Sequence, residues 1–220
     1  MPINKPFTDQ PNTWWDPKGP YWTLHAINPL RLGFILQYIK NGNALDIGCG
    51  GGILTEALAN HFNILGMDAD QALIDIANSR ESNARYQHGY LSSIVADHQE
   101  HFDLVTCLEV LEHVDNPQEM VRHIGEVTKP EGYVFFSTLN RNPISFLGAI
   151  VAAEYILNLL PKHTHQYEKF ITPAELINMA EAAQLELVDI QGILYNPLTK
   201  HFFTGKSTII NYIACFKKRS

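Results

Sequence analysis

The chain has 220 residues, of which 45% are hydrophobic and 18% are charged, and its formal net charge is −7. This composition predicts one folded domain over residues 1–220 and excludes a disordered chain. The acidic balance argues against nucleic acid as a partner, because nucleic-acid-binding surfaces are basic. No apolar stretch of signal-peptide length follows Met1, and the three cysteines are widely spaced, so we expect a protein of the reducing cytoplasm.

Residues 1–42 are predicted to form an N-terminal tail followed by a helix. Trp14 and Trp15 interrupt the polar tail, and we expect them to anchor it to the core. The helix is predicted to begin at Asn28 and Pro29, because Asn is a good cap and Pro fits the first helical position. Its apolar positions continue to Ile39, and a turn follows over 41–43.

From residue 44 onward, short apolar strands alternate with helices. Strands are expected over 44–48, 62–68, 84–88, 102–108, 133–138, 185–190 and 209–216, and helices over 53–60, 71–78, 118–128 and 174–183. A turn is expected over 129–132. This alternation predicts an α/β fold with a seven-stranded sheet, mostly parallel, whose last strand is antiparallel. Ligands of such sheets bind at the carboxyl ends of the strands.

A glycine-rich segment, residues 46–52, stands between the first strand and the next helix. Glycines such as Gly48 and Gly50 permit positive φ and a close approach of a ligand to the backbone. Asp68 stands at the tip of the following strand, where a carboxylate can accept hydrogen bonds from both hydroxyls of a ribose. The pair predicts a site for an adenosine-containing cofactor.

A dinucleotide does not fit the glycine segment. The dinucleotide pattern needs Gly or Ala at position 53, or at position 55 in the other register, and the chain has Ile53 and Thr55. Asp46 at the entrance of the loop would repel a pyrophosphate but can hold a cationic amine. S-adenosylmethionine has an ammonium group, a sulfonium group and no phosphate, so it is the predicted cofactor.

At this point the sequence resembles the ubiquinone biosynthesis O-methyltransferases, a branch of the class I S-adenosylmethionine-dependent methyltransferases. The resemblance spans most of the chain and rests on these motifs: WWD at 14–16, INPLR at 27–31, LDIGCGGGIL at 45–54, LEVLEHV at 108–114, STLNRN at 137–142, PKHTH at 161–165 and YNP at 195–197. It implies a Rossmann-like methyltransferase fold and polyprenyl-phenol or quinol substrates, namely a 2-polyprenyl-6-hydroxyphenol and a demethylubiquinol.

The resemblance also implies positions for the cofactor contacts. Arg31 corresponds to the residue that pairs with the methionine carboxylate, a task suited to a guanidinium group. Gly48 would lie under the methionine part, Asp68 would bind the ribose, and Leu108 would pack near the cofactor. The reading of the glycine segment adds Asp46 and Gly50 to the cofactor-binding set.

The segment after the fourth predicted strand carries Glu109, Glu112 and His113. If a helical turn begins there, the three side chains share one face and can hold a divalent cation such as magnesium. The resemblance implies the same three ligands. A metal would lower the pKa of a catechol hydroxyl. The alternative is a histidine general base, for which His113 and His165 are the catalytic candidates.

An apolar insertion, residues 143–170, contains a helix-length run from Ile144 to Leu160. Glu154 and Asn158 form one narrow polar stripe on an otherwise apolar helix. The run can be a core helix, a lid over a greasy substrate, or a helix at the membrane interface; seventeen residues are marginal for a bilayer span. The nearby Arg141, Lys162 and Lys169 favour anionic lipid.

The combined hypothesis is a cytoplasmic O-methyltransferase, peripheral at the inner membrane face, that takes a prenylated substrate from the membrane. The resemblance also suggests an assembly with other ubiquinone-synthesis proteins. Two alternatives remain at this point. One is a class I methyltransferase for another small acceptor, and the other is a lipid-surface binding module with a vestigial cofactor site.

Overall fold

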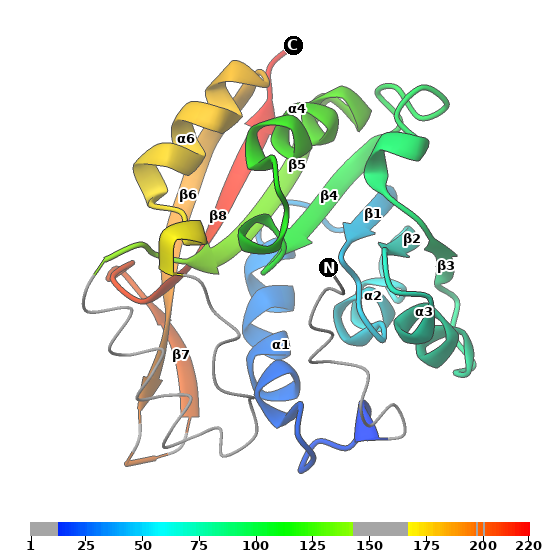
Figure 1. The fold of residues 1–220 in the computed structure, drawn as a ribbon, viewed down its shortest axis with the longest axis vertical. Helices are drawn as coiled ribbons and strands as arrows, with labels where there is room; N and C mark the ends of the chain where they lie inside the picture. Colours follow the sequence, from blue (N-terminus) through cyan, green and yellow to red (C-terminus); the bar gives the residue numbers. More distant parts are fainter. Residues whose placement is uncertain (1–12, 143–166, 197, 200) are drawn as a thin grey trace.

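A computed structural model describes residues 13–142, 167–196, 198–199 and 201–220. Within these residues a single sheet has eight strands in the order β3-β2-β1-β4-β5-β8-β6-β7 (Figure 1). Neighbouring strands from β3 to β5 pair in parallel, whereas β8 is antiparallel to both β5 and β6, and β7 is antiparallel to β6. The structure confirms the mostly parallel α/β sheet with its antiparallel C-terminal part.

The described elements follow the expected alternation of strands and helices. They are α1 (Trp22–Ile35), β1 (Asn43–Ile47), α2 (Ile53–Leu58), β2 (Asn63–Asp68), α3 (Gln71–Asn78), β3 (Arg85–His88), η2 (Leu91–Ser93), β4 (Phe102–Leu108), η3 (Leu111–His113), α4 (Pro117–Val127), β5 (Thr128–Leu139), η4 (Tyr167–Lys169), α6 (Pro173–Ala182), β6 (Leu185–Asn196), β7 (His201–Gly205) and β8 (Asn211–Lys218).

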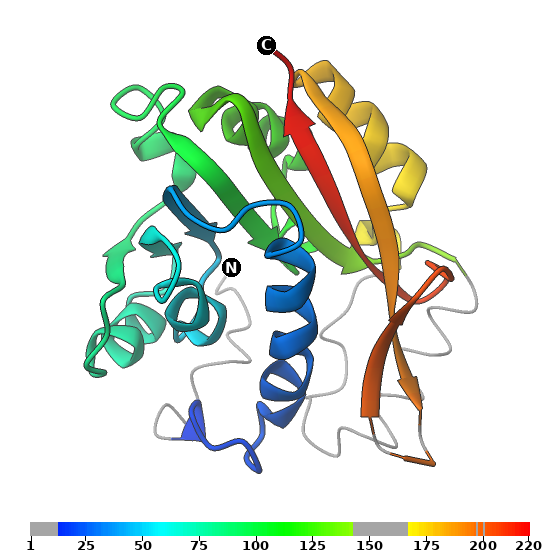
Figure 2. The same ribbon diagram turned by 180° about the vertical axis from the view of Figure 1, so that it is seen from behind.

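Helices cover both faces of the sheet, and each face has its own apolar core (Figure 2). On one face α4 and α6 contribute buried residues such as Ile124 and Leu176. On the other face α1 and α2 contribute buried residues such as Phe34 and Leu58. Burial of the strands on both sides explains why β4 is mostly apolar in the sequence. The three cysteines are buried and form no disulfide, as expected.

The start of α1 differs from the prediction. The helix begins at Trp22 and ends at Ile35, so Pro29 lies inside it and Ile39 lies beyond it. A proline inside a helix costs up to about 3 kcal/mol. The packing of Ile27, Phe34 and Ile35 against the sheet outweighs that cost.

Two further corrections concern the sheet. The predicted turn over 129–132 is an irregularity within β5, where the pairing with β4 jumps from Thr128 to Tyr133 and Glu131 adopts a φ of 66°. The sheet also has eight strands instead of seven, because residues 201–205 fold back as β7 on the end of β6. This short strand lies at the edge, and its sequence has no clear alternation that would predict it.

The apolar run Ile144–Leu160 and most of the insertion 143–170 lie outside the described residues, and so does His165. Among the helices that the structure describes, none has both the length and the apolarity needed to cross a membrane. The parallel strands β1, β2, β4 and β5 end at one edge of the sheet. Most of the predicted site residues lie at or just after these strand ends, and Arg31 lies on α1.

Candidate active site

The glycine loop connects β1 to α2 and has a conformation that requires glycine. Gly48, Gly50 and Gly52 have φ values of +69°, +55° and +90°, which side chains rarely adopt. A Cβ atom on Gly48 would also lie 2.3 Å from Cγ2 of Val110, in the segment that follows β4. The loop is therefore packed tightly against the segment that follows β4, and its backbone is the predicted cradle for the ligand.

Asp46 lies behind this loop and is 3% exposed. The hydroxyl of Thr55 donates to its Oδ2 at 2.6 Å, and the hydroxyl of Thr106 donates to its Oδ1 at 2.7 Å. Burial raises the pKa of Asp46 to about 6, although both hydroxyl hydrogen bonds favour the charged form. Asp46 thus supplies a fixed negative charge beneath the loop, and direct contact with an ammonium group stays a prediction.

Asp68 ends β2 and also fixes the glycine loop. Its Oδ2 accepts the N–H of Gly50 at 2.9 Å, and its Oδ1 accepts the N–H of Asp70 at 2.8 Å. Burial raises the pKa of Asp68 above its ordinary value. Each carboxylate oxygen retains a second lone pair, so the side chain can still accept hydrogen bonds from ribose hydroxyls.

Arg31 on α1 reaches the same edge and is 7% exposed. Its Nη2 donates to Oε1 of Glu109 at 3.0 Å. The Nε atom of Arg31 is buried and has no hydrogen-bond partner within the described part of the chain. A buried, unsatisfied donor on a cation is costly, and it is the type of group that a ligand carboxylate satisfies.

Glu109 is the centre of a polar cluster at the ends of β4, β5 and β8. Besides Arg31, the hydroxyl of Ser137 donates to its Oε1 at 2.8 Å, and Nδ2 of Asn211 donates to the same oxygen at 3.2 Å. Ser137 and Asn211 come from β5 and β8, and the sequence reasoning missed both. Ser137 lies within the STLNRN motif, which was a usable signal, whereas Asn211 had none.

The predicted helical turn from Glu109 does not form. Glu109 adopts a φ of 56°, and a 3-10 turn begins only at Leu111. Glu112 is 6% exposed, and His113 lies on the exposed side of that turn. Burial, together with the charge of the neighbouring Glu109, raises the pKa of Glu112 to about 8.

The two glutamates therefore come together, but the expected triad is not preassembled. Across the described residues, no group of three His, Cys, Asp or Glu side chains is placed to hold a metal ion. Magnesium on Glu109, Glu112 and His113 stays a prediction.

The residues fit an adenosyl amino acid as cofactor. Gly48 and Gly50 give the loop its left-handed backbone, Asp68 offers acceptors to a ribose, and Arg31 has a buried donor left over for a carboxylate. Leu108 is buried at the end of β4, beside the loop. These cofactor contacts are predicted from the fit of the groups.

Solved structures share this fold. A methyltransferase from Thermotoga maritima, described as S-adenosylmethionine-dependent and a possible histamine N-methyltransferase, aligns with a TM-score of 0.69 at 17% identity, over 96% of this chain and 98% of that one. The N-methyltransferase NodS from Bradyrhizobium japonicum, solved with S-adenosyl-L-homocysteine, aligns with a TM-score of 0.60 at 19% identity, over 96% and 93%. A family model described as a methyltransferase domain matches residues 26–190.

Fold, glycine loop and family model together define a class I S-adenosylmethionine-dependent methyltransferase. Sequence relatives narrow the class. A ubiquinone biosynthesis O-methyltransferase from Coxiella burnetii is 46% identical over 96% of this chain and 92% of that protein, and one from Nitrosospira multiformis is 43% identical over 96% and 91%. The chain belongs to the family of ubiquinone biosynthesis O-methyltransferases.

Proposed function

We propose that the chain transfers a methyl group from S-adenosylmethionine to a phenolic hydroxyl of polyprenyl catechols in ubiquinone synthesis. The substrates are a 2-polyprenyl-6-hydroxyphenol and 3-demethylubiquinol. The observation that carries the proposal is 43–46% identity over nearly the whole chain to relatives of that name. The edge that combines the glycine cradle, Asp68 and Arg31 supports it, because that edge has the groups that the cofactor needs.

The bound cofactor supplies an electrophilic methyl group on its sulfonium. In the reaction an oxygen–carbon bond forms at the acceptor, the carbon–sulfur bond breaks, and the phenolic proton leaves to a base. The protein aligns the three atoms and assists the loss of the proton. We assign cofactor alignment to Arg31, Gly48 and Asp68.

The base is proposed to be a histidine, either His113 or His165. His113 stands directly after the Glu109–Glu112 pair and is exposed, so it can be approached by an acceptor. His165 belongs to the insertion. In the competing mechanism, a magnesium ion lowers the pKa of the catechol hydroxyl. Activity with and without chelator distinguishes this mechanism from a histidine base.

A cleft beside this segment offers a path for the acceptor. It has a volume of about 520 Å³ and lies between η3, the start of α4 and the N-terminus of α6. Apolar side chains such as Leu111, Phe170 and Met179 line it together with the cations Arg141 and Lys169. An aromatic ring with an apolar tail matches such a mixed lining.

Membrane association is part of the same proposal. A polyprenyl tail partitions into the bilayer, and the enzyme has to collect its substrate there. We infer that the insertion 143–170 acts as a lid or interfacial helix that binds anionic lipid, and that the protein is peripheral at the inner face of the membrane. Contacts with other ubiquinone-synthesis proteins would follow from this location.

The test is methyl transfer from labelled S-adenosylmethionine to a catechol with a short prenyl tail, with added magnesium and with excess chelator. A matched catechol without the tail serves as the control acceptor. We expect methylation of the prenylated catechol at a higher kcat/KM than of the control.

Each condition of this experiment tests one alternative. Activity that disappears with chelator and returns with magnesium supports the Glu109–Glu112–His113 metal site. Activity that is indifferent to chelator leaves a histidine as base, and His113→Ala should then lower kcat. Cofactor binding without methylation of either catechol would contradict the acceptor class, and equal rates for both acceptors would favour a methyltransferase for another small molecule.

A further inference from the structure

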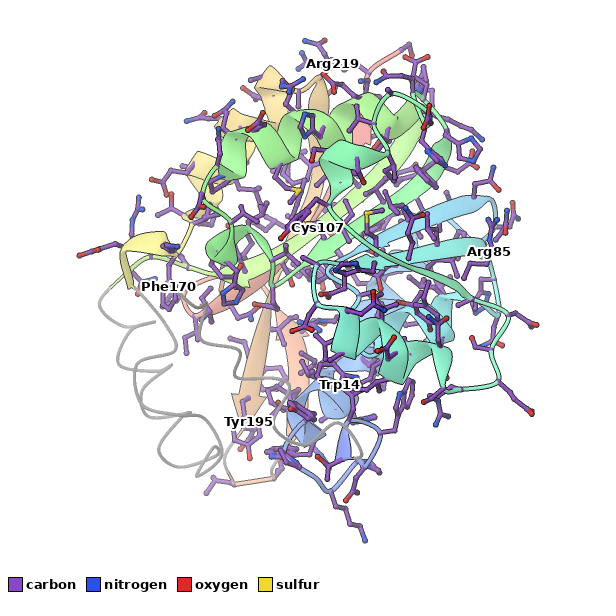
Figure 3. The ribbon with its side chains drawn as sticks, turned by 45° about the vertical axis from the view of Figure 1, so that its right-hand side comes forward. Trp14, Arg85, Cys107, Phe170, Tyr195 and Arg219 are labelled. Carbon is purple, nitrogen blue, oxygen red and sulfur yellow. The ribbon has the colours of Figure 1, made fainter. Side chains whose placement is uncertain are left out.

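The N-terminal segment lies directly on the glycine loop. Trp14 is 4% exposed, and it lies where α1, α2 and α3 meet (Figure 3). A Cβ atom on Gly51 would lie 2.4 Å from Cδ1 of Trp14, and one on Gly50 would lie 2.8 Å from its Cζ2. Gly50 and Gly51 are therefore needed to admit the indole ring of Trp14.

Trp15 is joined to the same loop by a hydrogen bond. Its Nε1 donates to the carbonyl of Gly51 at 3.1 Å. The guanidinium of Arg80 stacks on its ring, with 3.9 Å between Cζ and the ring centroid, and Nε of Arg80 donates to Oε1 of Glu56 at 2.8 Å. Trp15 thus links the glycine loop to Arg80, which follows α3, and through it to Glu56 on α2. We call Trp14 and Trp15, with these contacts, the tryptophan strap.

The strap is also attached to α1, the helix that carries Arg31. Nε2 of His25 donates to the carbonyl of Trp14 at 2.9 Å, and the Trp14 ring contacts Tyr21 with 4.4 Å between centroids. One turn later, Nδ2 of Asn28 donates to the carbonyl of Ile53 at 3.1 Å. The strap and α1 therefore connect the loop to the arginine on the opposite side of the cofactor site.

We propose that Trp14 and Trp15 are positioning residues for the cofactor: the tryptophan strap holds the glycine loop in its binding conformation and slows release of the cofactor. This role depends on the proposed methyltransferase function and assigns two residues that the proposed function does not use. A loop with three left-handed glycines is expensive to order, because glycine loses the most backbone freedom on folding. A loop that is already ordered does not lose that freedom when the ligand binds, so affinity rises.

The competing role is a structural anchor that fastens the N-terminal tail. An anchor affects the free energy of unfolding and leaves the affinity for the cofactor unchanged. A positioning role changes the affinity in a protein that remains folded. The two roles are therefore distinguished by measuring both quantities on the same variants.

The first variant is Trp15→Phe, which keeps an aromatic ring for the Arg80 guanidinium but removes the N–H donor to Gly51. Trp22→Phe is the matched control, because Trp22 packs on Phe202, with 6.2 Å between centroids, away from the loop. Dissociation constants and dissociation rates for S-adenosylhomocysteine are measured by calorimetry and stopped flow, and Tm is recorded for each protein.

We expect Trp15→Phe to weaken the binding of S-adenosylhomocysteine about threefold to tenfold, mostly through faster dissociation. A loss of this size is what removal of one hydrogen bond implies. KM for the cofactor should rise while kcat at saturation stays the same. Trp22→Phe should bind the ligand as the parent chain does. A lower Tm for Trp15→Phe with an unchanged dissociation constant would overturn the proposal and leave the anchor.

A second variant guards against a simple loss of folding. Gly51→Ala retains both tryptophans, and its new methyl group has to displace the Trp14 ring. We expect weaker S-adenosylhomocysteine binding together with greater quenching of tryptophan fluorescence by acrylamide. Gly33→Ala, at a position with no heavy atom within 4 Å of the added Cβ, is its control. Increased quenching with unchanged affinity would contradict the positioning role.

Discussion

The site at the carboxyl ends of the strands has a cofactor side, at β1 and β2, and an acceptor side, at β4 and β5. The two sides are built in different ways. At the ends of β1 and β2, contacts within the motif join residues close in sequence: Asp46 and Thr55 are 9 residues apart, and Gly50 and Asp68 are 18 apart, although Thr106 also reaches Asp46 from 60 residues away. At the ends of β4 and β5, Glu109 is held by Arg31 and Asn211, which are 78 and 102 residues away. The cofactor side is a local motif, whereas the acceptor side is assembled by the fold.

The charges of the two halves differ as well. The cofactor side places two carboxylates, Asp46 and Asp68, behind and beside a neutral backbone cradle, which suits a cationic ligand. The acceptor side places one guanidinium against two neighbouring carboxyl groups. Arg31 belongs to both halves, so it is the residue through which the occupancy of one half can affect the other.

The largest effect should come from Gly48→Ala, because the left-handed φ and the 2.3 Å approach to Val110 leave no room for a methyl group. We expect S-adenosylhomocysteine affinity to fall by more than about 100-fold. The measurement is calorimetric titration of the folded variant, whose integrity is checked by circular dichroism. If Gly48→Ala binds S-adenosylhomocysteine within a few-fold of the parent chain, the claim that the glycine loop is ordered before the ligand binds is wrong.

Arg31→Met should have the next largest effect, because the guanidinium is proposed to bind the methionine carboxylate. We expect S-adenosylhomocysteine to bind about tenfold to hundredfold more weakly. Methylthioadenosine, which lacks the amino-acid end, should bind the variant and the parent chain alike. An equal loss for both ligands would show that Arg31 acts only through the fold. Arg122→Met, on an exposed helix face with Glu119 and Glu126, is the control.

Stability should depend on pH through Asp46. Burial raises its pKa from an ordinary 3.8 to about 6, so the folded chain holds this proton more tightly than the unfolded chain. The contribution of Asp46 to stability therefore falls as pH rises from about 4 to about 6 and stays low above that. Relative to Asp46→Asn, the parent chain should lose about 1–3 kcal/mol between pH 4.5 and 7.

Urea unfolding of both proteins at several pH values measures this difference. Carboxyl groups with a lowered pKa, such as Asp103 and Glu175, have the opposite dependence below their own ordinary pKa values. They are common to both proteins and cancel in the comparison. A constant difference across the window would contradict a buried, destabilised charge beneath the loop.

The smallest effect should come from Ser137→Ala, which removes one of the donors to Glu109. We expect kcat to fall about twofold to tenfold with little change in KM for the cofactor, because one hydrogen bond contributes about 1 kcal/mol. Steady-state kinetics with both substrates varied gives these values. A selective rise in KM for the cofactor would instead assign Ser137 to the cofactor side of the site.

The sequence predicts the cofactor half well because its signals are local. Glycine at 48, 50 and 52 and an acid at the tip of β2 imply the loop conformation that the structure shows. The helices α3 and α6 were also predicted closely, since Asp70 and Thr172 cap them with side-chain hydrogen bonds. In each case the responsible residues lie within a few positions of the feature.

The acceptor half could not be predicted in the same way. A helical turn from Glu109 was plausible on spacing, but long-range partners on α1, β5 and β8 fix that side chain. Long-range packing also places Pro29 inside α1, an arrangement that does not follow from propensity because it depends on surfaces that exist only after the sheet has formed. The β6–β7 hairpin is local, with Asn196 opposite His201, and the sequence does not predict it because the short strand β7 has no clear alternation.

The most direct test of the account is a crystal structure of the chain with S-adenosylhomocysteine. The central claim predicts the ribose hydroxyls on the carboxylate of Asp68, the homocysteine part over Gly48, and its carboxylate on the guanidinium of Arg31. A ligand bound away from the ends of β1 and β2, or one whose carboxylate is held by another cation while Arg31 remains paired with Glu109 alone, would contradict it.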